Sequence, residues 1–436
     1  MTAQLTSVAP RPPAHAELDR AAAALLEANT CRVGQDGRSY RFSVPSVRHY
    51  PFQWLWDSCF HAIVWARSDV ARAKQELEGL LDAQRADGMI PHVLFWDQSK
   101  IKRRNIFPYF ESQLSLGDLA RGVKPRCTAQ SQPPMLAQAV EAIVARDPIP
   151  LPYLARVLPK LERLYRFWAN ERDPDEDGLI STISQFETGL DYSPCYDQVI
   201  GYRGGGPLSM FLRTRVVEWR NQRAGYATAR LMEGPDQVED VLLNVAFADG
   251  LHALARLAAL AEQPLLAGWA SEGAARTTSA LLERCWDADR GVFWNLAGLE
   301  ERRCDRVKTI QGLLPLVLPG LPGEVVARLL ETLTDPKQFW PAFPVPSVAL
   351  DAAEFLPDSH IRGVRFIWRG PLSANTNWFL YRGLQLYGES RYADELGAKT
   401  RELAQTHGFN EFHNPLTGAP TGEQDFGWAT LAACLA

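Results

Sequence analysis

The chain has 436 residues, of which 46% are hydrophobic and 22% are charged, so it can bury a large core. Its net charge of −5 provides no basic surface for nucleic acid, and no apolar run approaches the ~18 residues that a membrane-spanning helix needs. The seven cysteines are scattered without a CxxC pair, and the eight histidines show no metal-ligand spacing. We therefore expect a cytoplasmic protein with reduced thiols, no bound metal, and no nucleic-acid or membrane partner.

The N-terminal part of the chain begins with a segment rich in proline and alanine. Residues 1–15 are predicted to be a disordered tail and lack the basic and then apolar pattern of a signal peptide, whereas residues 16–436 are predicted to form a single domain. Strong helix formers predict a helix over 18–29, followed by a hairpin-like excursion over 33–44. A long helix is then expected over 62–85, where an Asp-Gly pair ends it.

Most of the remaining chain is predicted to be helical, because apolar residues recur three and four positions apart. Further helices are expected at 135–146, 152–171, 208–224, 237–261, 264–285, two within 313–333, then 376–386, 390–407, and from 424 to the C-terminus. Loops rich in aromatic and acidic residues follow alternate helices, with a longer excursion over 86–131. The sequence has no period of fixed length, which argues against a helical repeat protein. This pattern predicts an all-α fold, an α/α toroid whose loops line one mouth.

The thirteen tryptophans and twelve tyrosines stand in part beside aspartate, glutamine and asparagine, which is typical of a sugar-stacking pocket. The sequence WLWD places Trp54, Trp56 and Asp57 just before a predicted inner helix. An aspartate there can hold two sugar hydroxyls while a tryptophan stacks on the ring. By itself, this stretch favours the simpler alternative of a core tryptophan followed by a helix-capping aspartate.

The stretch FETGLDYSPCY, residues 186–196, places Glu187 and Asp191 around Gly189, which permits a tight backbone path. Pro194 prevents a helix from continuing there. We interpret the stretch as a loop that directs Asp191 into a pocket. A capping aspartate in a surface loop fits this stretch equally well.

The loop DPDEDG at 173–178 matches the opening of a calcium-binding loop, with acids at alternate positions and then glycine. The twelfth position of such a loop should be glutamate, but here it is Ser184. The similar DADRG at 287–291 suggests that the same inter-helix turn is used twice. The sequence therefore favours a solvated turn over a cation site.

Two later segments combine charged and aromatic residues with turn formers. Residues 363–378 contain Arg365 and Arg369, which can bind a carboxylate through forked hydrogen bonds; solvated or capping arginines are the alternative. Residues 409–428 form a long loop before the last predicted helix, and presenting a carboxylate is a physical reason for such a loop. Its acids are Glu411, Glu423 and Asp425.

Carboxylates from separate parts of a chain are what glycoside hydrolysis needs. One carboxylic acid protonates the departing oxygen, and a second carboxylate attacks the sugar or activates water. Asp191 and a C-terminal glutamate satisfy this requirement, although spacing does not choose between Glu411 and Glu423.

Six motifs in order give the chain a resemblance that covers nearly all of it after residue 45. They are FQWLWDSCFHA (52–62), DGMIPH (87–92), SQPPMLAQA (131–139), ETGLDYSP (187–194), WRGPLSANTNWFLYRGL (368–384) and FNEFHNPLTG (409–418). Together they resemble glycoside hydrolase family 63, and within it the short bacterial glucosylglycerate and mannosylglycerate hydrolases. Each motif alone is weak, but six in family order are specific.

The resemblance implies an (α/α)6 barrel that hydrolyses an α-glycoside with inversion. It implies that Asp191 is the general acid and that Glu411, rather than Glu423, is the general base. An inverting pair should have carboxyl groups about 6.5–9.5 Å apart, leaving room for water. Asp191 must keep its proton near neutral pH, so burial and a neighbouring carboxylate, with Glu187 as the hypothesis, should raise its pKa.

The resemblance also implies substrate-binding residues. Trp54, Trp56, Asp57, Trp368 and Arg369 match strips that line the site in the family. Candidates for the glycerate end are Tyr109, Gln113, Arg203 and Gln424.

We expect a small-molecule glycoside as the partner and no cofactor, because proton transfer and electrostatics suffice for this chemistry. Homo-oligomerisation stays open. The alternatives are a trehalase-like or oligosaccharide α-glucosidase on the same fold, a sugar epimerase, which would need facing histidines, and a non-catalytic sugar-binding toroid.

Overall fold

The computed structural model describes residues 13–35, 37–101, 121 and 123–435. Tyr109 and Gln113 lie outside the described residues. The α-helices are α1 (Pro13–Ala28), α2 (Leu55–Trp65), α3 (Val70–Asp82), α5 (Leu136–Val144), α6 (Leu151–Glu171), α7 (Pro207–Arg223), α8 (Thr228–Met232), α9 (Val241–Leu260), α10 (Pro264–Ala280), α11 (Gly323–Leu333), α12 (Ala374–Leu386) and α13 (Ser390–His407). Two 3-10 segments, η7 (Ile310–Val317) and η8 (Gly427–Cys434), complete the framework.

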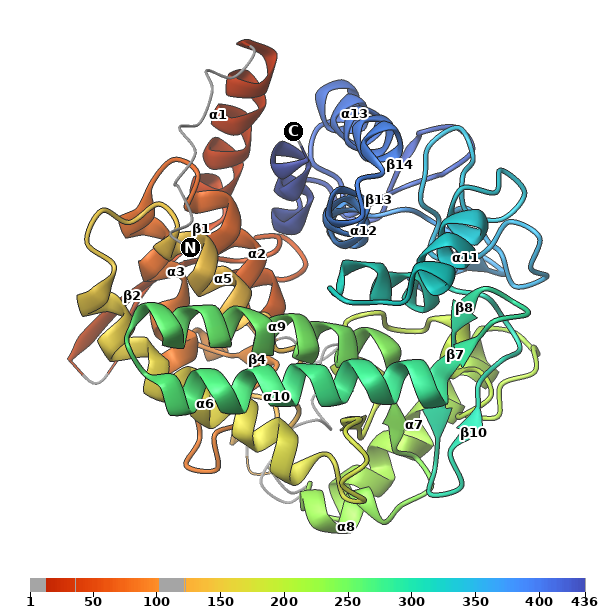
Figure 1. Ribbon diagram of the computed structural model, residues 1–436, viewed down its shortest axis with the longest axis horizontal. Coiled ribbons are helices and arrows are strands. Elements are labelled where there is room, and N and C mark those ends of the chain that lie inside the picture. Colours follow the sequence, from red (N-terminus) through yellow and green to blue (C-terminus); the bar gives the residue numbers. More distant parts are fainter. Residues whose placement is uncertain (1–12, 36, 102–120, 122, 436) are drawn as a thin grey trace.

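The helices pack as neighbouring pairs around a central ring. Within each pair, α9 lies beside α10, α2 beside α3, and α12 beside α13 (Figure 1). Six elements contact one another in a closed cycle, in the order α2, α5, α9, η7, α12, η8 and back to α2. The cycle forms the inner layer, and α3, α6, α10, α11 and α13 pack outside it. This arrangement is an α/α toroid, as the sequence predicted.

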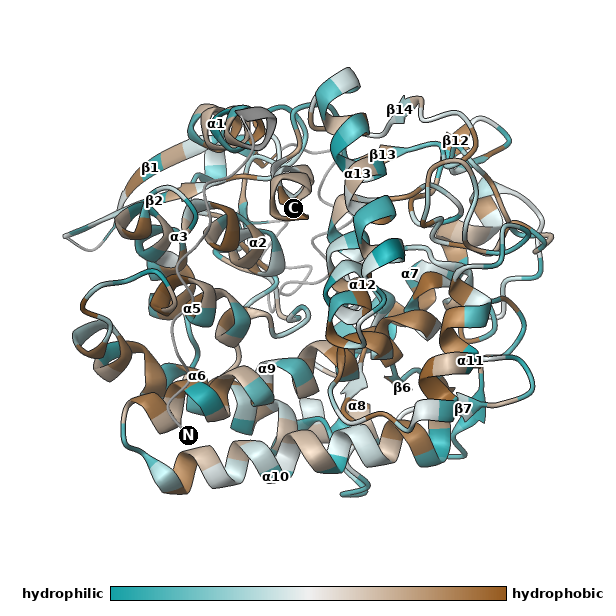
Figure 2. Cartoon of the chain, turned by 45° about the horizontal axis from the view of Figure 1, so that its top comes forward, coloured by the Kyte–Doolittle hydropathy of each residue, from teal (hydrophilic) through white to brown (hydrophobic). Residues whose placement is uncertain are grey.

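Hydrophobic patterning explains which helices lie inside. Every residue of α2 is buried, as are 16 of the 20 residues of α9, because both helices are predominantly apolar and such helices lie in a core. The α9 helix is long and apolar enough to cross a membrane, but 89% of its most apolar window is buried inside the protein. Figure 2 shows the contrast between the apolar α5 and the mainly polar α13 of the outer layer.

Several boundaries differ from the sequence predictions. The single helix expected over 62–85 is wrong, because α2 ends at Trp65 and Asp69 begins α3 by accepting a hydrogen bond from the Arg72 backbone N–H at 2.9 Å. The α1 helix begins at Pro13, inside the segment expected to be a tail. The last helical segment begins at Gly427 rather than at 424, and it is a 3-10 segment.

Short strands join the helices, and their length explains why the sequence pattern missed most of them. The expected hairpin is confirmed as β1 (Thr30–Gln35) paired with β2 (Arg38–Ser43). The other pairs have two residues a strand: β3 (Gln53–Trp54) with β4 (Val93–Leu94), β7 (Trp286–Asp287) with β8 (Val292–Phe293), β11 (His360–Ile361) with β12 (Val364–Arg365), and β13 (Phe412–His413) with β14 (Pro420–Thr421). A four-stranded sheet has the order β10 (Arg302–Arg303), β9 (Leu296–Ala297), β6 (Val238–Glu239), β5 (Ser181–Thr182). Two residues are too few to show a period of two.

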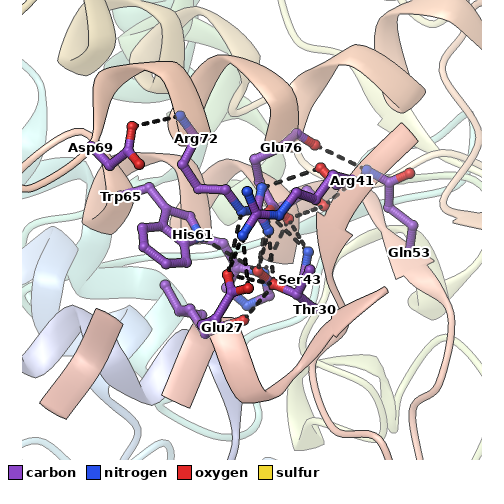
Figure 3. A network of polar contacts seen from close by, with 12 residues as sticks. Glu27, Thr30, Arg41, Ser43, Gln53, His61, Trp65, Asp69, Arg72 and Glu76 are labelled. Carbon is purple, nitrogen blue, oxygen red and sulfur yellow. Dashed lines mark hydrogen bonds and ion pairs between the residues drawn. The ribbon is translucent and has the colours of Figure 1, made fainter. Parts of the chain in front are cut away.

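A buried polar network fixes the start of α2 to its surroundings (Figure 3). Glu76 on α3 pairs with Arg72 at 3.1 Å, and both side chains are buried. Its carboxylate also accepts hydrogen bonds from the Ser43 backbone N–H and the Ser58 hydroxyl. Gln53 on β3 donates to the Glu76 carbonyl oxygen at 3.0 Å. The network therefore holds in place the strand–helix junction that carries the WLWD sequence.

Candidate active site

Two adjoining cavities open within the toroid where the aromatic and acidic loops meet. The inner cavity, of about 50 Å³, is lined by residues that include Trp54, Trp56, Asp57, Asp191, Trp368 and Glu411. The outer cavity, of about 410 Å³, is lined by residues that include His49, Tyr50, Trp54, His92, Asp191, Tyr192, Arg215 and Arg365. Tyr50, Trp54, Asp191 and Ile367 line both cavities. Asp191 therefore stands at their junction, and Glu411 lies in the inner cavity.

The loop before Asp191 is fitted closely against an aromatic ring. Gly189 has a φ of +74°, and a Cβ added there would lie 2.5 Å from the Trp56 ring. Any other residue would therefore be strained by its backbone conformation and would collide with Trp56. After Asp191, the Tyr192 backbone N–H donates to the Gln185 side-chain oxygen at 2.8 Å. These contacts fix the backbone on both sides of the acid.

Arg369 supports this loop from outside the two cavities. Its side chain is only 2% exposed and forms a forked ion pair with Asp197, at 2.7 and 3.0 Å. The same guanidinium donates to the Tyr192 carbonyl oxygen at 2.9 Å. The residues that line the two cavities do not include Arg369. It therefore braces the backbone next to Asp191, although the sequence placed it among the residues that bind substrate.

Glu187 is likewise part of the support of the loop. It forms a forked ion pair with Arg172, at 2.8 and 2.9 Å, and both side chains are buried. Its carboxylate also accepts the backbone N–H groups of Ser131 and Ile183, each at 3.0 Å. The Glu187 carboxylate is therefore bonded to Arg172 and to two backbone N–H groups, and Glu187 lines neither cavity.

Burial raises the pKa of Asp191 to about 8, with the nearby Glu411 carboxylate as the second cause. Glu218 adds a smaller contribution in the same direction. The neighbours that raise this pKa are therefore Glu411 and Glu218, whereas the sequence hypothesis named Glu187. This shift favours the protonated form of Asp191.

Glu411 is 1% exposed and stands immediately before β13. One oxygen, Oε2, accepts hydrogen bonds from Arg365 and from the Glu423 backbone N–H, both at 2.9 Å. Burial raises the pKa of Glu411, and the Arg365 guanidinium opposes this effect. Gly422 leaves room for the arrangement, since a Cβ there would lie 2.6 Å from the Arg365 Nη2 atom and 2.8 Å from Glu411 Oε2.

Glu423, the other glutamate that the sequence could not separate from Glu411, has different partners. Its Oε1 atom accepts a hydrogen bond from Ser46 at 2.8 Å, and its Oε2 atom lies 2.5 Å from His49 Nδ1. Its backbone N–H and carbonyl oxygen both bond to Glu411. The Glu423 backbone thus supports the backbone of Glu411, and the Glu423 carboxylate contacts Ser46 and His49.

Trp54, Trp56 and Asp57 of the WLWD sequence line the inner cavity, and Trp56 and Asp57 lie in the first turn of α2, not before it as expected. Burial, with Glu411 and Asp191 nearby, raises the pKa of Asp57 well above its usual range. Its Oδ1 atom and the indole N–H of Trp54 have no hydrogen-bond partner among the described residues. Buried polar atoms need partners, and sugar hydroxyls can supply them.

Arg203 and Gln424 are both exposed, and neither lines a cavity. The structure instead brings Tyr50, His49 and Arg215 to the outer cavity, and the sequence did not indicate these residues. Arg215 lies on α7, where the sequence pattern cannot tell which side of the helix faces a cavity. Tyr50 stands four residues before Trp54, so the proximity of an aromatic residue to the WLWD motif was the signal that could have revealed it.

Comparisons with known proteins identify the family of the chain. A family profile described as the mannosylglycerate hydrolase MGH1-like glycoside hydrolase domain matches residues 50–429. The chain is 31% identical to a mannosylglycerate hydrolase of Thermus thermophilus, over 90% of this chain and 95% of that protein. It is 27% identical to a glucosylglycerate hydrolase of Mycolicibacterium hassiacum, over 88% of this chain and 91% of that protein.

A solved structure also matches closely. The family 63 mannosylglycerate hydrolase of Thermus thermophilus in complex with Tris and D-glycerate superposes with a TM-score of 0.81 at 27% identity. The match covers 96% of this chain and 99% of that one, and it confirms the resemblance to family 63. The chain belongs to the MGH1-like family of glycoside hydrolases.

Proposed function

We propose that this glycoside hydrolase cleaves mannosylglycerate or glucosylglycerate with inversion at the anomeric carbon. The observation that carries the proposal is the pair of acids at the shared cavity. Asp191 has a pKa of about 8, while Glu411 is held by Arg365. The relatives named as mannosylglycerate and glucosylglycerate hydrolases support this substrate class.

In this mechanism, protonated Asp191 is the general acid. Its proton passes to the glycosidic oxygen as the bond from that oxygen to the anomeric carbon breaks. Glu411 removes a proton from a water whose oxygen attacks the anomeric carbon from the opposite face. The hydrogen bonds from Arg365 and Glu423 both end on Oε2, so we assign Oε1 to the water. We expect the two carboxyl groups to stand about 6.5–9.5 Å apart.

We place the sugar at the inner end of the site, with Trp54, Trp56 and Trp368 against its faces and Asp57 on its hydroxyls. The glycerate end would then extend into the outer cavity, where Arg215 and Arg365 provide positive charge. Arg215 on α7 lines the outer cavity, and it is our candidate for the glycerate carboxylate.

The closed cycle of six inner elements supports a specific (α/α)6 barrel, which we propose for residues 16–436 as one domain. Acid–base chemistry of this kind calls for no organic cofactor. A cytoplasmic location stays a prediction, and so does homo-oligomerisation.

Hydrolysis of a small substrate panel by the purified protein tests the proposal. The panel holds glucosylglycerate, mannosylglycerate, trehalose, kojibiose and an aryl α-glucoside, and NMR of the fresh product identifies the first anomer released. We expect a β-sugar from a glycerate glycoside. Cleavage of the disaccharides alone would move the function to the trehalase-like alternative. Release of an α-sugar would overturn inversion.

A further inference from the structure

Tyr192 follows Asp191 directly and has an uncommon backbone conformation. Its φ is +64°, in the left-handed region that bulky side chains rarely adopt. The Ser193 backbone N–H donates to the Leu190 carbonyl oxygen at 3.1 Å, so residues 190–193 form a tight turn with Tyr192 in its third position. A turn with a positive φ at that position favours glycine or asparagine. The chain therefore keeps a costly tyrosine beside the proposed general acid.

Two further hydrogen bonds hold the Tyr192 backbone in this conformation. Its N–H donates to the Gln185 side-chain oxygen at 2.8 Å, and its carbonyl oxygen accepts a hydrogen bond from the Arg369 guanidinium at 2.9 Å. Strained residues persist only where the surrounding structure fixes them, and they are found most often at functional sites. The strain at Tyr192 is therefore a reason to ask what its side chain does.

Two phenylalanines hold the Tyr192 ring at the wall of the outer cavity. Its centroid lies 5.8 Å from that of Phe186 at an interplanar angle of 86°, and 5.1 Å from that of Phe366 at 77°. Both pairs have the edge-to-face arrangement that aromatic rings favour. Phe186 lines the same cavity, whereas Phe366 is buried in an apolar cluster with Tyr202. The Tyr192 ring is therefore a fixed part of the cavity wall.

The inner cavity has a similar aromatic wall. Trp368 lines that cavity, and its φ of +62° also lies in the left-handed region. Trp368 directly precedes Arg369, whose guanidinium bonds to the Tyr192 carbonyl oxygen. One buried arginine thus connects an aromatic residue of the inner cavity to one of the outer cavity, with Asp191 at the junction between them.

We propose that Tyr192 is a specificity-determining residue that limits the bulk of the leaving group, an inference that rests on the proposed function. The proton of Asp191 passes to the glycosidic oxygen, so the group attached to that oxygen lies beside the residue that follows Asp191. A short chain such as glycerate passes the Tyr192 ring and directs its carboxylate toward Arg215 in the same cavity. A hexose has substituents around a whole ring and collides with Tyr192, because Phe186 and Phe366 prevent it from moving aside.

Tyr192→Asn tests the proposal, since asparagine tolerates a positive φ and removes the aromatic ring. Its kcat/KM would be measured on three substrates of one sugar: the glycerate glycoside, a disaccharide and the α-glycosyl fluoride. Fluoride is too small to reach the outer cavity, so the fluoride reports on the inner cavity and on Glu411. We expect the ratio of kcat/KM for the glycerate glycoside to that for the disaccharide to fall about tenfold, with the rate on the fluoride within about threefold of the wild type. An unchanged ratio, or an equal loss on all three substrates, would overturn the proposal.

Tyr192→Trp should move the same ratio in the opposite direction. Tryptophan is already accepted at a positive φ in this protein, at Trp368, and its larger ring narrows the outer cavity. The ratio should therefore rise by about fivefold or more. This variant decides the question if Tyr192→Asn fails to fold, because an unchanged or lower ratio would contradict a limit on bulk.

Two further variants are matched controls. Glu262→Asn makes the same replacement at an exposed residue with a φ of +56°, between α9 and α10 and outside both cavities, and it should leave the ratio unchanged. Tyr192→Phe keeps the ring without its hydroxyl and should also keep the ratio. A loss in Tyr192→Phe as large as in Tyr192→Asn would show that the hydroxyl selects the leaving group, and a loss as large in Glu262→Asn would remove the role of the cavity wall.

The wild-type protein separates a failure of this inference from a failure of the proposed function. Cleavage of disaccharides alone by the wild type would overturn the proposed function and the limit on bulk together. A wild-type preference for the glycerate glycoside that stays the same in Tyr192→Asn and Tyr192→Trp would overturn this inference alone.

Discussion

Asp191 and Glu411 line the same cavity, yet their surroundings differ in charge. At Asp191, burial and the negative neighbours Glu411 and Glu218 raise the pKa to about 8. Glu411 is also buried, but Arg365 and a backbone N–H both bond to its Oε2 atom. Burial raises the pKa of both carboxyls, but at Glu411 the Arg365 guanidinium opposes this effect. We propose that this difference lets one buried carboxyl act as the acid and the other, with a cation beside it, act as the base.

The largest expected effect comes from removing either carboxyl. Asp191→Asn and Glu411→Gln should each lower kcat on the glycerate glycoside by about a thousandfold or more, because each removes a proton-transfer group. Both variants should keep the Tm of the wild type within a few degrees. Glu423→Gln is the matched control for Glu411→Gln, since it lies in the same loop and keeps its backbone hydrogen bonds to Glu411. A comparable loss in the control would contradict the assignment of the base.

Removing the positive charge of Arg365 should make the pKa values of the two acids more alike. Arg365→Gln is expected to lower kcat by about a hundredfold, because it removes a charged hydrogen bond to Glu411. Arg365 lowers the pKa of Glu411, so its loss should raise that pKa and move the acidic limb of the pH–rate profile to higher pH. An unchanged acidic limb would show that Arg365 does not set the charge state of the base.

The pH dependence of kcat/KM tests the protonation of Asp191, the proposed acid. The pKa of Asp191 is raised to about 8, so its catalytic proton is present below that pH and is lost as the pH rises through it. We expect activity to fall about tenfold for each unit above pH 8. A rate that stays constant up to pH 10 would contradict Asp191 as the acid.

The smallest expected effect on rate comes from changing Arg369, which supports the loop that carries Asp191. Arg369→Lys breaks the forked pair with Asp197 and the hydrogen bond to the Tyr192 carbonyl oxygen. We expect kcat to fall by up to about tenfold with KM little changed, and the buried pair to cost about 3–5 kcal/mol of folding stability if it is fully broken. The alkaline limb of the pH–rate profile should also move, because Asp191 is displaced. Lost stability with an unchanged profile would limit Arg369 to a structural role.

The sequence predicted the toroid and the two acid-bearing loops because helical periodicity and turn residues are local signals. It did not separate Glu411 from Glu423 by spacing, and the family resemblance alone distinguished them. It also placed Glu187 and Arg369 in the site, since a charged residue beside a catalytic motif looks the same whether it meets substrate or a buried partner. Their partners, Arg172 and Asp197, are known only once the chain is folded.

Long-range packing explains the other omissions. Arg215 reaches the outer cavity through the orientation of α7, and Tyr192 is held at that cavity by Phe366, from a distant part of the chain. Neither relation leaves a mark in the local sequence.

The most direct test of the division of roles uses a substrate whose leaving group needs no proton. Asp191→Asn and Glu411→Gln would be compared on the glycerate glycoside and on the α-glycosyl fluoride of the same sugar. Fluoride departs without acid assistance, so Asp191→Asn should recover most of its activity on the fluoride, while Glu411→Gln should stay inactive on both substrates. Recovery by Glu411→Gln instead of Asp191→Asn would reverse the assignment of acid and base.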